Sequence, residues 1–338
     1  MIVEMIRGAT EAETNQVVAT ARGLGFDVQM NYGSEKTVVA ILGSETGRTA
    51  TDTFALLPGV LSVQRIMKPY KLASREFRPQ STVANVAGIE IGGTRLVVMA
   101  GPCAVESEEQ VFQTAQAVKK AGARILRGGA YKPRTSPFSF QGLQEEGLKI
   151  LSRVRDALDM PIITEVMDTH EVDLVARHAD ILQVGARNMQ NYSLLREVGR
   201  TGRPVVLKRG FSSTINEWLT AADYVLAEGN ENVILCERGI RTFEDSTRFS
   251  LDISSLPVVH KFSHLPIIVD PSHPAGHFEY VPALAKAGLA AGADGLLIEV
   301  HPNPSQALVD GLQSLTFERF ERLMSELSTL AQALGRTL

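Results

Sequence analysis

The sequence is poor in cysteine, has no excess of positive charge and contains no long apolar run. With only Cys103 and Cys236 the chain has no disulfide framework, so each thiol is a candidate for burial, chemistry or metal binding. The 34 lysines and arginines against 38 acidic residues give a net charge of −4, which argues against a nucleic-acid partner. No stretch approaches the roughly 18 apolar residues that a membrane helix needs, and residues 1–14 lack the pattern of a signal peptide. We therefore expect a cytoplasmic protein that binds neither nucleic acid nor a membrane.

The first part of the chain, residues 1–68, has the pattern of a small separate domain. An alternating strand opens it, and a helix follows over residues 11–23, with Thr10 as its cap and Glu13 at the capping-box position. Further strands and a second helix complete the β-α-β-β-α-β order of a ferredoxin-like domain, at residues 26–32, 37–43, 49–56 and 60–67. Residues 69–82, with their prolines and basic side chains, predict a linker.

Residues 83–338 show a different pattern, in which apolar strands alternate with amphipathic helices. Strands are expected at residues 96–101, 123–130, 161–167, 181–186, 204–210, 232–238, 266–272 and 295–301. Eight near-continuous apolar strands favour a closed parallel (β/α)8 barrel, the TIM barrel, over an antiparallel sandwich. Residues 85–93 predict a hairpin on the barrel floor, and Cys236 is expected to face the barrel interior. Residues 242–263 have no clear helical period, so the sixth helix is the least defined.

Polar residues follow every predicted barrel strand, at the end where a barrel of this type assembles its active site. For any single position the simpler interpretation is the first solvated residue of a loop. Because all eight strand ends share the feature, we interpret it as a site on that rim. The residues are Cys103, Arg127, Lys132, Arg134, Glu165, Arg187, Lys208, Arg238, Asp270, His273, Glu299 and His301.

Six of these residues are cations, and we call them the cationic ring. Like charges on one rim repel each other unless an anion neutralises them, and guanidinium groups match the oxygens of phosphate and carboxylate. The ring therefore predicts a substrate, or substrates, with several negative charges. Its members are Arg127, Lys132, Arg134, Arg187, Lys208 and Arg238.

A second set of strand-end residues is suited to a metal. A thiolate, an imidazole and carboxylates fit a divalent transition metal such as Zn²⁺, Fe²⁺, Mn²⁺ or Co²⁺. The set comprises Cys103, His273 and Glu299, with Asp310 as a candidate fourth member. A buried structural thiol is the alternative for Cys103 alone. Asp270 is expected to support His273 rather than to bind the metal.

Seven motifs occur in an order that resembles one enzyme family. They are GPCAVES (101–107), KPRTS (132–136), GARNMQN (185–191), KRG (208–210), ERG (237–239), VDPSH (269–273) and IEVHPNP (298–304). The chain resembles the 3-deoxy-D-arabino-heptulosonate 7-phosphate (DAHP) synthases, in the type I form that carries an N-terminal ferredoxin-like regulatory domain. The resemblance implies condensation of phosphoenolpyruvate with erythrose 4-phosphate and water to DAHP and phosphate. This is the first step of the shikimate pathway to aromatic amino acids.

The resemblance also implies a role for each site residue. Cys103, His273, Glu299 and Asp310 would be the metal ligands, and Lys132 and Glu165 would order the water. The remaining positions would bind substrate: phosphoenolpyruvate at Arg127, Lys132, Ala186, Arg187, Lys208 and Arg238, and the aldose phosphate at Arg134, Thr135 and Ser136.

The resemblance extends to regulation and assembly. Related proteins with this domain arrangement suggest that the N-terminal domain senses tyrosine or phenylalanine, and that the protein is a homotetramer. A role of that domain in assembly or solubility alone is the alternative, because likeness of fold is weak evidence for function.

Three other functions are compatible with parts of the pattern. The sister enzyme, 3-deoxy-D-manno-octulosonate 8-phosphate synthase, uses arabinose 5-phosphate, but its family is expected to have Lys-Ala-Asn-Arg-Ser where this chain has KPRTS over residues 132–136. Pro133 cannot offer the side-chain amide that asparagine gives to a longer sugar, which favours the four-carbon aldose. A non-catalytic regulatory barrel leaves the metal set unexplained. A Schiff-base aldolase that uses Lys208 leaves Cys103 and His273 unused.

Overall fold

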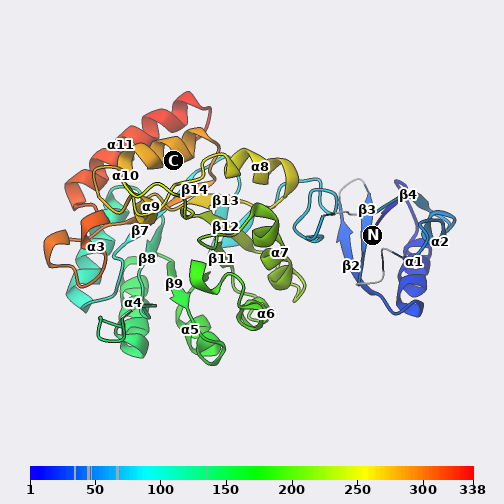
Figure 1. Ribbon diagram of the computed structural model, residues 1–338, viewed down its shortest axis with the longest axis horizontal. Helices are drawn as coiled ribbons and strands as arrows, with labels where there is room; N and C mark the ends of the chain where they lie inside the picture. Colours follow the sequence, from blue (N-terminus) through cyan, green and yellow to red (C-terminus); the bar gives the residue numbers. More distant parts are fainter. Residues whose placement is uncertain (34–35, 44–45, 47, 66–67, 135) are drawn as a thin grey trace. The chain divides into compact units, whose positions relative to one another are not determined.

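The computed structural model describes residues 1–33, 36–43, 46, 48–65, 68–134 and 136–338. These residues divide into two compact units. Figure 1 colours the chain along its sequence, from blue at the N-terminus to red at the C-terminus. The first unit comprises Met1–Ser81 together with Phe262–His264, and the second comprises Thr82–Lys261 and Leu265–Leu338. In the part of the chain that is described, no helix combines the length and the apolar character needed to cross a membrane.

The first unit is a small antiparallel sheet with helices. Its elements are β1 (Ile2–Met5), α1 (Glu11–Gly23), β2 (Asp27–Tyr32), β3 (Thr37–Leu42), α2 (Asp52–Ala55) and β4 (Val60–Gln64), with strand order β2-β3-β1-β4. The predicted capping box begins α1: the Thr10 hydroxyl accepts from the Glu13 N–H, and the Glu13 carboxylate accepts from the Thr10 N–H at 2.7 Å. Helix α2 is shorter than the helix predicted over residues 49–56. It begins after Thr51, whose side chain makes no capping hydrogen bond.

Residues 69–82, predicted to be a linker, contain several side chains that are buried within the first unit. Tyr70, Leu72, Ala73 and Phe77 are all buried. The Asn31 side chain on β2 donates a hydrogen bond to the Phe77 carbonyl at 3.1 Å. Most of the segment therefore belongs to the first unit, whose boundary follows Ser81.

The second unit is a closed barrel of parallel strands with helices around it, as predicted (Figure 1). The strands are β7 (Val97–Gly101), β8 (Ile125–Arg127), β9 (Ile162–Val166), β10 (Ile181–Val184), β11 (Val205–Lys208), β12 (Val233–Glu237), β13 (Ile267–Val269) and β14 (Gly295–Glu299). The helices are α3 (Glu108–Lys120), α4 (Gln144–Leu158), α5 (Val172–His178), α6 (Tyr192–Arg200), α7 (Ile215–Leu226), α8 (Ser255–Phe262), α9 (Ser272–Ala275), α10 (Val281–Ala290) and α11 (Phe317–Ala333). Short 3-10 turns are η2 (Thr169–Glu171), η3 (Ala186–Asn188), η4 (Pro304–Gln306) and η5 (Gly311–Gln313).

The barrel interior is a packed apolar core, closed at one end by a hairpin. Strands β5 (Ala84–Val86) and β6 (Ile89–Ile91) pair with each other, and Val86 and Ile91 join the core cluster formed by the barrel strands. Cys236 belongs to the same cluster and is fully buried, as the sequence predicts. Burial of each large apolar side chain contributes about 1.5–3 kcal/mol, so this core fixes the positions of the strand ends that carry the polar residues.

Candidate active site

A cavity of about 270 Å³ lies at the carboxyl ends of the barrel strands. It is lined by Lys132, Pro133, Arg134, Ser136, Ser139, Glu165, Gly185, Ala186, Arg187, Lys208, Phe211, Arg238, Arg248, Phe249, His273, Val309 and Asp310. Cys103, Arg127 and Glu299 are buried and do not line the cavity. Cys103 contacts Lys132 and Glu299 contacts His273 in its wall, and Arg127 donates to Glu299. Thr135 lies outside the described residues. The structure thus brings together the other residues predicted to bind substrate or metal, whereas the predicted rim residue His301 does not line the cavity and contacts Glu106.

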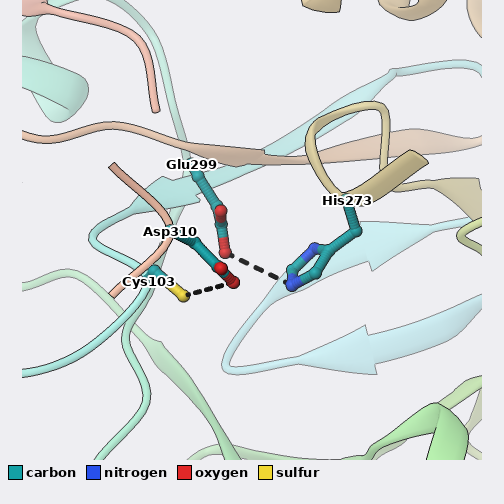
Figure 2. A group of neighbouring side chains, drawn as sticks. All are labelled: Cys103, His273, Glu299 and Asp310. Carbon is teal, nitrogen blue, oxygen red and sulfur yellow. Dashed lines mark hydrogen bonds and ion pairs between the residues drawn. The ribbon is translucent and has the colours of Figure 1, made fainter. Parts of the chain in front are cut away.

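Four potential metal ligands converge beside this cavity (Figure 2). One donor atom from each of Cys103, His273, Glu299 and Asp310 lies within 4.8 Å of the others. Figure 2 shows the His273 ring directed at Glu299, with Nε2 at 3.5 Å from Oε1, while Cys103 Sγ lies 3.5 Å from Asp310 Oδ2. A thiol, an imidazole and two carboxylates at this spacing match the mixed donor set of a divalent transition metal. The residues therefore fit such an ion.

His273 is held in place by Asp270, at the turn between β13 and α9. Asp270 Oδ1 accepts from the backbone N–H groups of Ser272 and His273 at 3.1 and 3.0 Å. Its Oδ2 lies 2.6 Å from His273 Nδ1 and 2.7 Å from Lys208 Nζ. Burial alone would raise the pKa of Asp270, but His273 and Lys208 outweigh it and hold that pKa well below its usual range. The ionised Asp270 therefore leaves Nε2 of His273 directed at the ligand cluster, as expected of a supporting residue.

Glu299, at the end of β14, is ionised and fully hydrogen bonded. Its Oε1 accepts from Arg127 Nη1 at 2.7 Å, and its Oε2 accepts from Gln313 Nε2 at 2.6 Å. Burial opposes the charge, but His273 and Arg127 lower the pKa of Glu299 to about 2. By contrast, burial and the Glu299 charge raise the pKa of Cys103 to about 12. A metal cation is the partner that would favour the thiolate form.

Lys132, in the loop after β8, and Glu165, on the neighbouring strand β9, both line the cavity. Lys132 Nζ lies 3.2 Å from Cys103 Sγ, and although burial opposes its charge, the surrounding acidic groups raise the pKa of Lys132. Glu165 Oε2 accepts from Gln183 Nε2 at 3.2 Å. Gly185 lies close beside it, and a Cβ there would lie 2.0 Å from Glu165 Oε1, so a larger residue would displace the carboxylate. The backbone therefore approaches Glu165 closely and limits where its carboxylate can lie.

Three arginines of the cationic ring keep a buried nitrogen without a partner among the described residues. The atoms are Arg127 Nε, Arg134 Nη1 and Arg238 Nη1. An unsatisfied buried donor costs about 1–3 kcal/mol, and more when it is charged. Arg134 and Arg238 line the cavity, and Arg127 lies beneath it. These free nitrogens indicate that an anionic ligand completes the site.

Arg238 is stacked on two aromatic rings that sequence reasoning missed. Its guanidinium carbon lies 4.2 Å from the ring centroid of Phe249 and 4.9 Å from that of Phe211. The two rings are themselves stacked, 5.1 Å apart and 8° from parallel. Burial lowers the pKa of Arg238, and these ring faces offset part of the desolvation of its charge. Phe211 directly follows the KRG motif, which was the only signal for it in the sequence.

Arg248 is a further cation that the sequence analysis did not include. Its Nη1 lies 3.2 Å from Asp310 Oδ1 and donates to Gln313 Oε1 at 3.0 Å. Arg248 and Phe249 both lie in the irregular segment before α8, within residues 242–263, where no period was found. The missing period therefore marks a loop that supplies side chains to the site.

Residues 76–334 match the family model described as the DAHP synthetase I family, and residues 1–68 match the DAHP synthase ferredoxin-like domain. The chain belongs to the DAHP synthetase I family. This confirms the resemblance drawn from the motifs, including its N-terminal ferredoxin-like domain.

Known members of the DAHP synthase family resemble the chain along nearly its whole length. It is 48% identical over 335 residues to the phospho-2-dehydro-3-deoxyheptonate aldolase of Thermotoga maritima, with 99% of each chain covered. A crystal structure of the DAHP synthase from Thermotoga maritima superposes with a TM-score of 0.80 and 47% identity, covering 99% of this chain and 98% of that one. A 2-dehydro-3-deoxyphosphooctonate aldolase of Acidithiobacillus ferrooxidans is more distant, at 35% identity over 67% of this chain and 86% of its own.

Proposed function

We propose that the chain catalyses the DAHP synthase reaction, the condensation of phosphoenolpyruvate with erythrose 4-phosphate and water that yields DAHP and phosphate. The observation that carries the proposal is the set of buried arginine nitrogens without a described partner, directly beside a four-ligand cluster. Such a site combines anion recognition with a Lewis acid, which is what a condensation of two phosphate esters requires. The similarity to the family supports the same reaction.

We propose that Cys103, His273, Glu299 and Asp310 hold a divalent metal, of which Mn²⁺, Fe²⁺, Zn²⁺ and Co²⁺ all suit the donor set. When bound, such an ion supplies Lewis-acid polarisation of the aldehyde carbonyl. Asp270 would keep His273 oriented, and the ionised Glu299 would contribute charge.

The cationic ring would bind phosphoenolpyruvate. Arg187, Lys208 and Arg238, with the backbone N–H of Ala186, would hold its phosphate, because all four residues line the cavity. Arg127 and Lys132 would lie beside the carboxylate and the bridging oxygen, with the free Arg127 Nε as a donor. Cations at these positions stabilise charge as it moves during the reaction.

The chemistry would then proceed by bond changes at C2 and C3 of phosphoenolpyruvate. The C2–C3 double bond supplies the electron pair that joins C3 to the aldehyde carbon, and C2 becomes electron deficient. The carbonyl pair moves onto the aldehyde oxygen, which becomes a hydroxyl by taking up one proton, balanced by the proton that water releases. Water adds to C2 and gives up a proton, for which Glu165 is the acceptor that faces the cavity. The C2–O bond to phosphate then breaks, and the Lys132 ammonium would stabilise the departing oxygen. The products are the ketone at C2 and inorganic phosphate.

The aldose phosphate would bind at Arg134, Thr135 and Ser136, whose loop also carries Pro133. Phosphate release should therefore be faster with erythrose 4-phosphate than with arabinose 5-phosphate. The assay is carried out on metal-stripped protein with and without added Mn²⁺. Faster release with arabinose 5-phosphate would indicate the octulosonate reaction, and no turnover with either aldose in the presence of metal would indicate a non-catalytic barrel.

A Schiff-base mechanism at Lys208 is disfavoured by its surroundings. Lys208 Nζ is buried and already donates to the Asp270 carboxylate at 2.7 Å, so this nitrogen is held by a structural contact rather than presented to a substrate carbonyl. Borohydride treatment with substrate should leave the mass of the protein unchanged. A substrate adduct on Lys208 would contradict this.

We propose that the first unit is a regulatory domain, whose ferredoxin-like part is residues 1–68. Residues 83–338 would form the catalytic barrel. Tyrosine or phenylalanine would be the inhibitor, and the protein would be a cytoplasmic homotetramer. Deleting the chain through Ser81, rather than through residue 68, avoids exposing Tyr70, Leu72 and Phe77. The shortened protein should retain turnover and lose inhibition; inhibition that persists would place the inhibitor elsewhere.

A further inference from the structure

Glu106 belongs to the GPCAVES motif but has no role in the proposed reaction. Its side chain is largely buried, and each carboxylate oxygen has a partner on the loop between β14 and α11. Oε1 accepts a hydrogen bond from the backbone N–H of Leu308 at 2.9 Å. Oε2 lies 3.4 Å from His301 Nε2. One carboxylate therefore contacts this loop at two places, one near its start and one near its middle.

His301 is oriented toward Glu106 by its own neighbour. Its Nδ1 lies 3.1 Å from the backbone N of Asn303, which can only donate. We assign the ring hydrogen of the neutral imidazole to Nε2, which then donates to Glu106. The buried His301 ring thus joins the beginning of the loop to the start of α3, where Glu106 directly precedes the helix cap Ser107.

The two contacts flank the segments that carry candidate metal ligands. Glu106 follows Cys103 by three positions, His301 follows Glu299 by two, and Leu308 precedes Asp310 by two. Glu106 thereby connects the segments of three of the four ligands. The fourth, His273, is held separately by Asp270.

Asp310 lies in an uncommon backbone conformation. It is left-handed, with φ 52° and ψ 34°, a region that aspartate enters more readily than most residues other than glycine. The neighbouring Val309 is buried against Cys103 and Ala104. Leu308 itself is 54% exposed, and its backbone N–H is held by the hydrogen bond to Glu106.

We propose that Glu106 is a positioning residue, which acts through His301 and Leu308 to hold Glu299 and Asp310 beside Cys103 and so sets the affinity for the divalent metal. The inference rests on the metal site of the proposed function. Residues that support metal ligands in this way typically change affinity by about 10–100-fold when they are replaced.

The test is calorimetric titration of Mn²⁺ into the metal-stripped full-length protein and its variants. Glu106→Ala should bind one Mn²⁺ per chain with a Kd about 10–100-fold higher than that of the unaltered protein. Glu106→Gln should show a smaller increase, because its amide oxygen can still accept from the Leu308 N–H. His301→Ala should also weaken binding. Glu109→Ala removes an exposed carboxylate at the start of the same helix and should leave the Kd unchanged.

A kinetic measurement separates positioning from damage to the fold. In Glu106→Ala the Mn²⁺ concentration needed for half-maximal rate should rise, while kcat at saturating Mn²⁺ and KM for phosphoenolpyruvate stay close to their original values. If Glu106→Ala fails to fold, Glu106→Gln and His301→Ala decide the question.

Two results would overturn different statements. Unchanged Mn²⁺ affinity in the Glu106 and His301 variants, when the unaltered protein binds one ion, overturns the positioning role alone. Failure of the unaltered protein to bind Mn²⁺, or equal binding by Asp310→Asn, overturns the metal assignment in the proposed function.

Discussion

At the scale of single residues, the site combines charges that would be costly to bury apart. Arg238 has one nitrogen with no partner among the described residues, and the face of its guanidinium stacks on Phe249. Asp270 contacts both Lys208 and His273. The strand-end cations and the metal set could be predicted from the sequence because chemistry of that kind uses few residue types. The aromatic support could not, since a phenylalanine in a loop has the same sequence pattern whether it stacks on an arginine or points into water.

Phe249→Leu tests the aromatic support of Arg238. Loss of the ring face removes a cation–π contact worth about 0.5–2 kcal/mol, so KM for phosphoenolpyruvate should rise by about 2–30-fold, with a smaller change in kcat. Steady-state kinetics at saturating metal measures both. Phe243→Leu, in the same loop but with a fully exposed ring, is the matched control and should behave like the unaltered protein. Equal KM values for the two variants would show that the stacking does not contribute to binding.

At the scale of elements, adjacent residues at the ends of β11 and β12 have different surroundings. Lys208 and Arg238 line the cavity, whereas the residues beside them, Arg209 and Glu237, pair with each other at 2.9 Å. Arg209 also contacts Asp252 at 2.7 Å, in the loop before α8. An ion network behind the cavity therefore fixes the loop that carries Arg248 and Phe249.

Arg209→Met should destabilise the barrel strongly. Burial raises the pKa of Glu237, only partly offset by Arg209, so removing Arg209 leaves a buried carboxylate without its partner at a cost of about 3–5 kcal/mol. Urea unfolding followed by fluorescence of Trp218, the only tryptophan, measures the loss. Lys149→Met breaks the exposed pair with Glu145 and should change stability little. A similarly small effect for Arg209→Met would mean that the network is dispensable.

The elements themselves differ in how far the sequence could predict them. All eight barrel strands were predicted because each is an apolar run buried on both faces, and the capping box at Thr10 marked the start of α1 correctly. The loop before α8 could not be derived, because its Arg248 and Asp252 pair with Asp310 and Arg209, which are distant in sequence. Likewise, the burial of residues 70–77 depends on tertiary contacts that prolines and basic residues do not reveal.

At the scale of the whole molecule, the two units should respond differently to pH. His264 is buried in the first unit, where its Nε2 contacts the Leu72 carbonyl at 2.7 Å. Burial, aided by the charges of Arg75 and Arg78 and opposed by the Leu72 hydrogen bond, lowers the pKa of His264 from 6.5 to about 4. In the unfolded chain this histidine becomes protonated near pH 6.5, whereas in the folded protein it becomes protonated only near pH 4. Stability is therefore lost progressively as the pH falls between these values.

The prediction is that His264→Gln loses less stability than the unaltered protein between pH 7.5 and 4.5. The difference should be on the order of 2 kcal/mol in the free energy of unfolding, since each pKa unit corresponds to about 1.4 kcal/mol. Far-UV circular dichroism during urea unfolding follows both units. His277→Gln, an exposed histidine, provides the control. Parallel pH profiles for His264→Gln and the unaltered protein would contradict the assignment.

Metal addition should act on the barrel alone. Mn²⁺ at about 100 times its Kd should stabilise the folded barrel by about 2.7 kcal/mol, because it binds the folded state. The midpoint temperature of thermal unfolding, followed by Trp218 fluorescence, should therefore rise on addition of Mn²⁺. Chelation of the metal should reverse this rise. Asp310→Asn should show a reduced shift. An equal shift in that variant would place the bound ion outside the four-ligand cluster.

The pairing of β7 with β14 joins the first and last strands of the barrel, with Gly101 beside Glu299. Contacts between residues so far apart in the chain are slow to form, because a long loop must close first. Cys103 and Glu299 therefore meet only when this seam closes, so the metal site does not exist in a chain whose barrel is still open. Metal bound there would stabilise only the closed barrel. It should therefore slow unfolding and leave the rate of folding nearly unchanged.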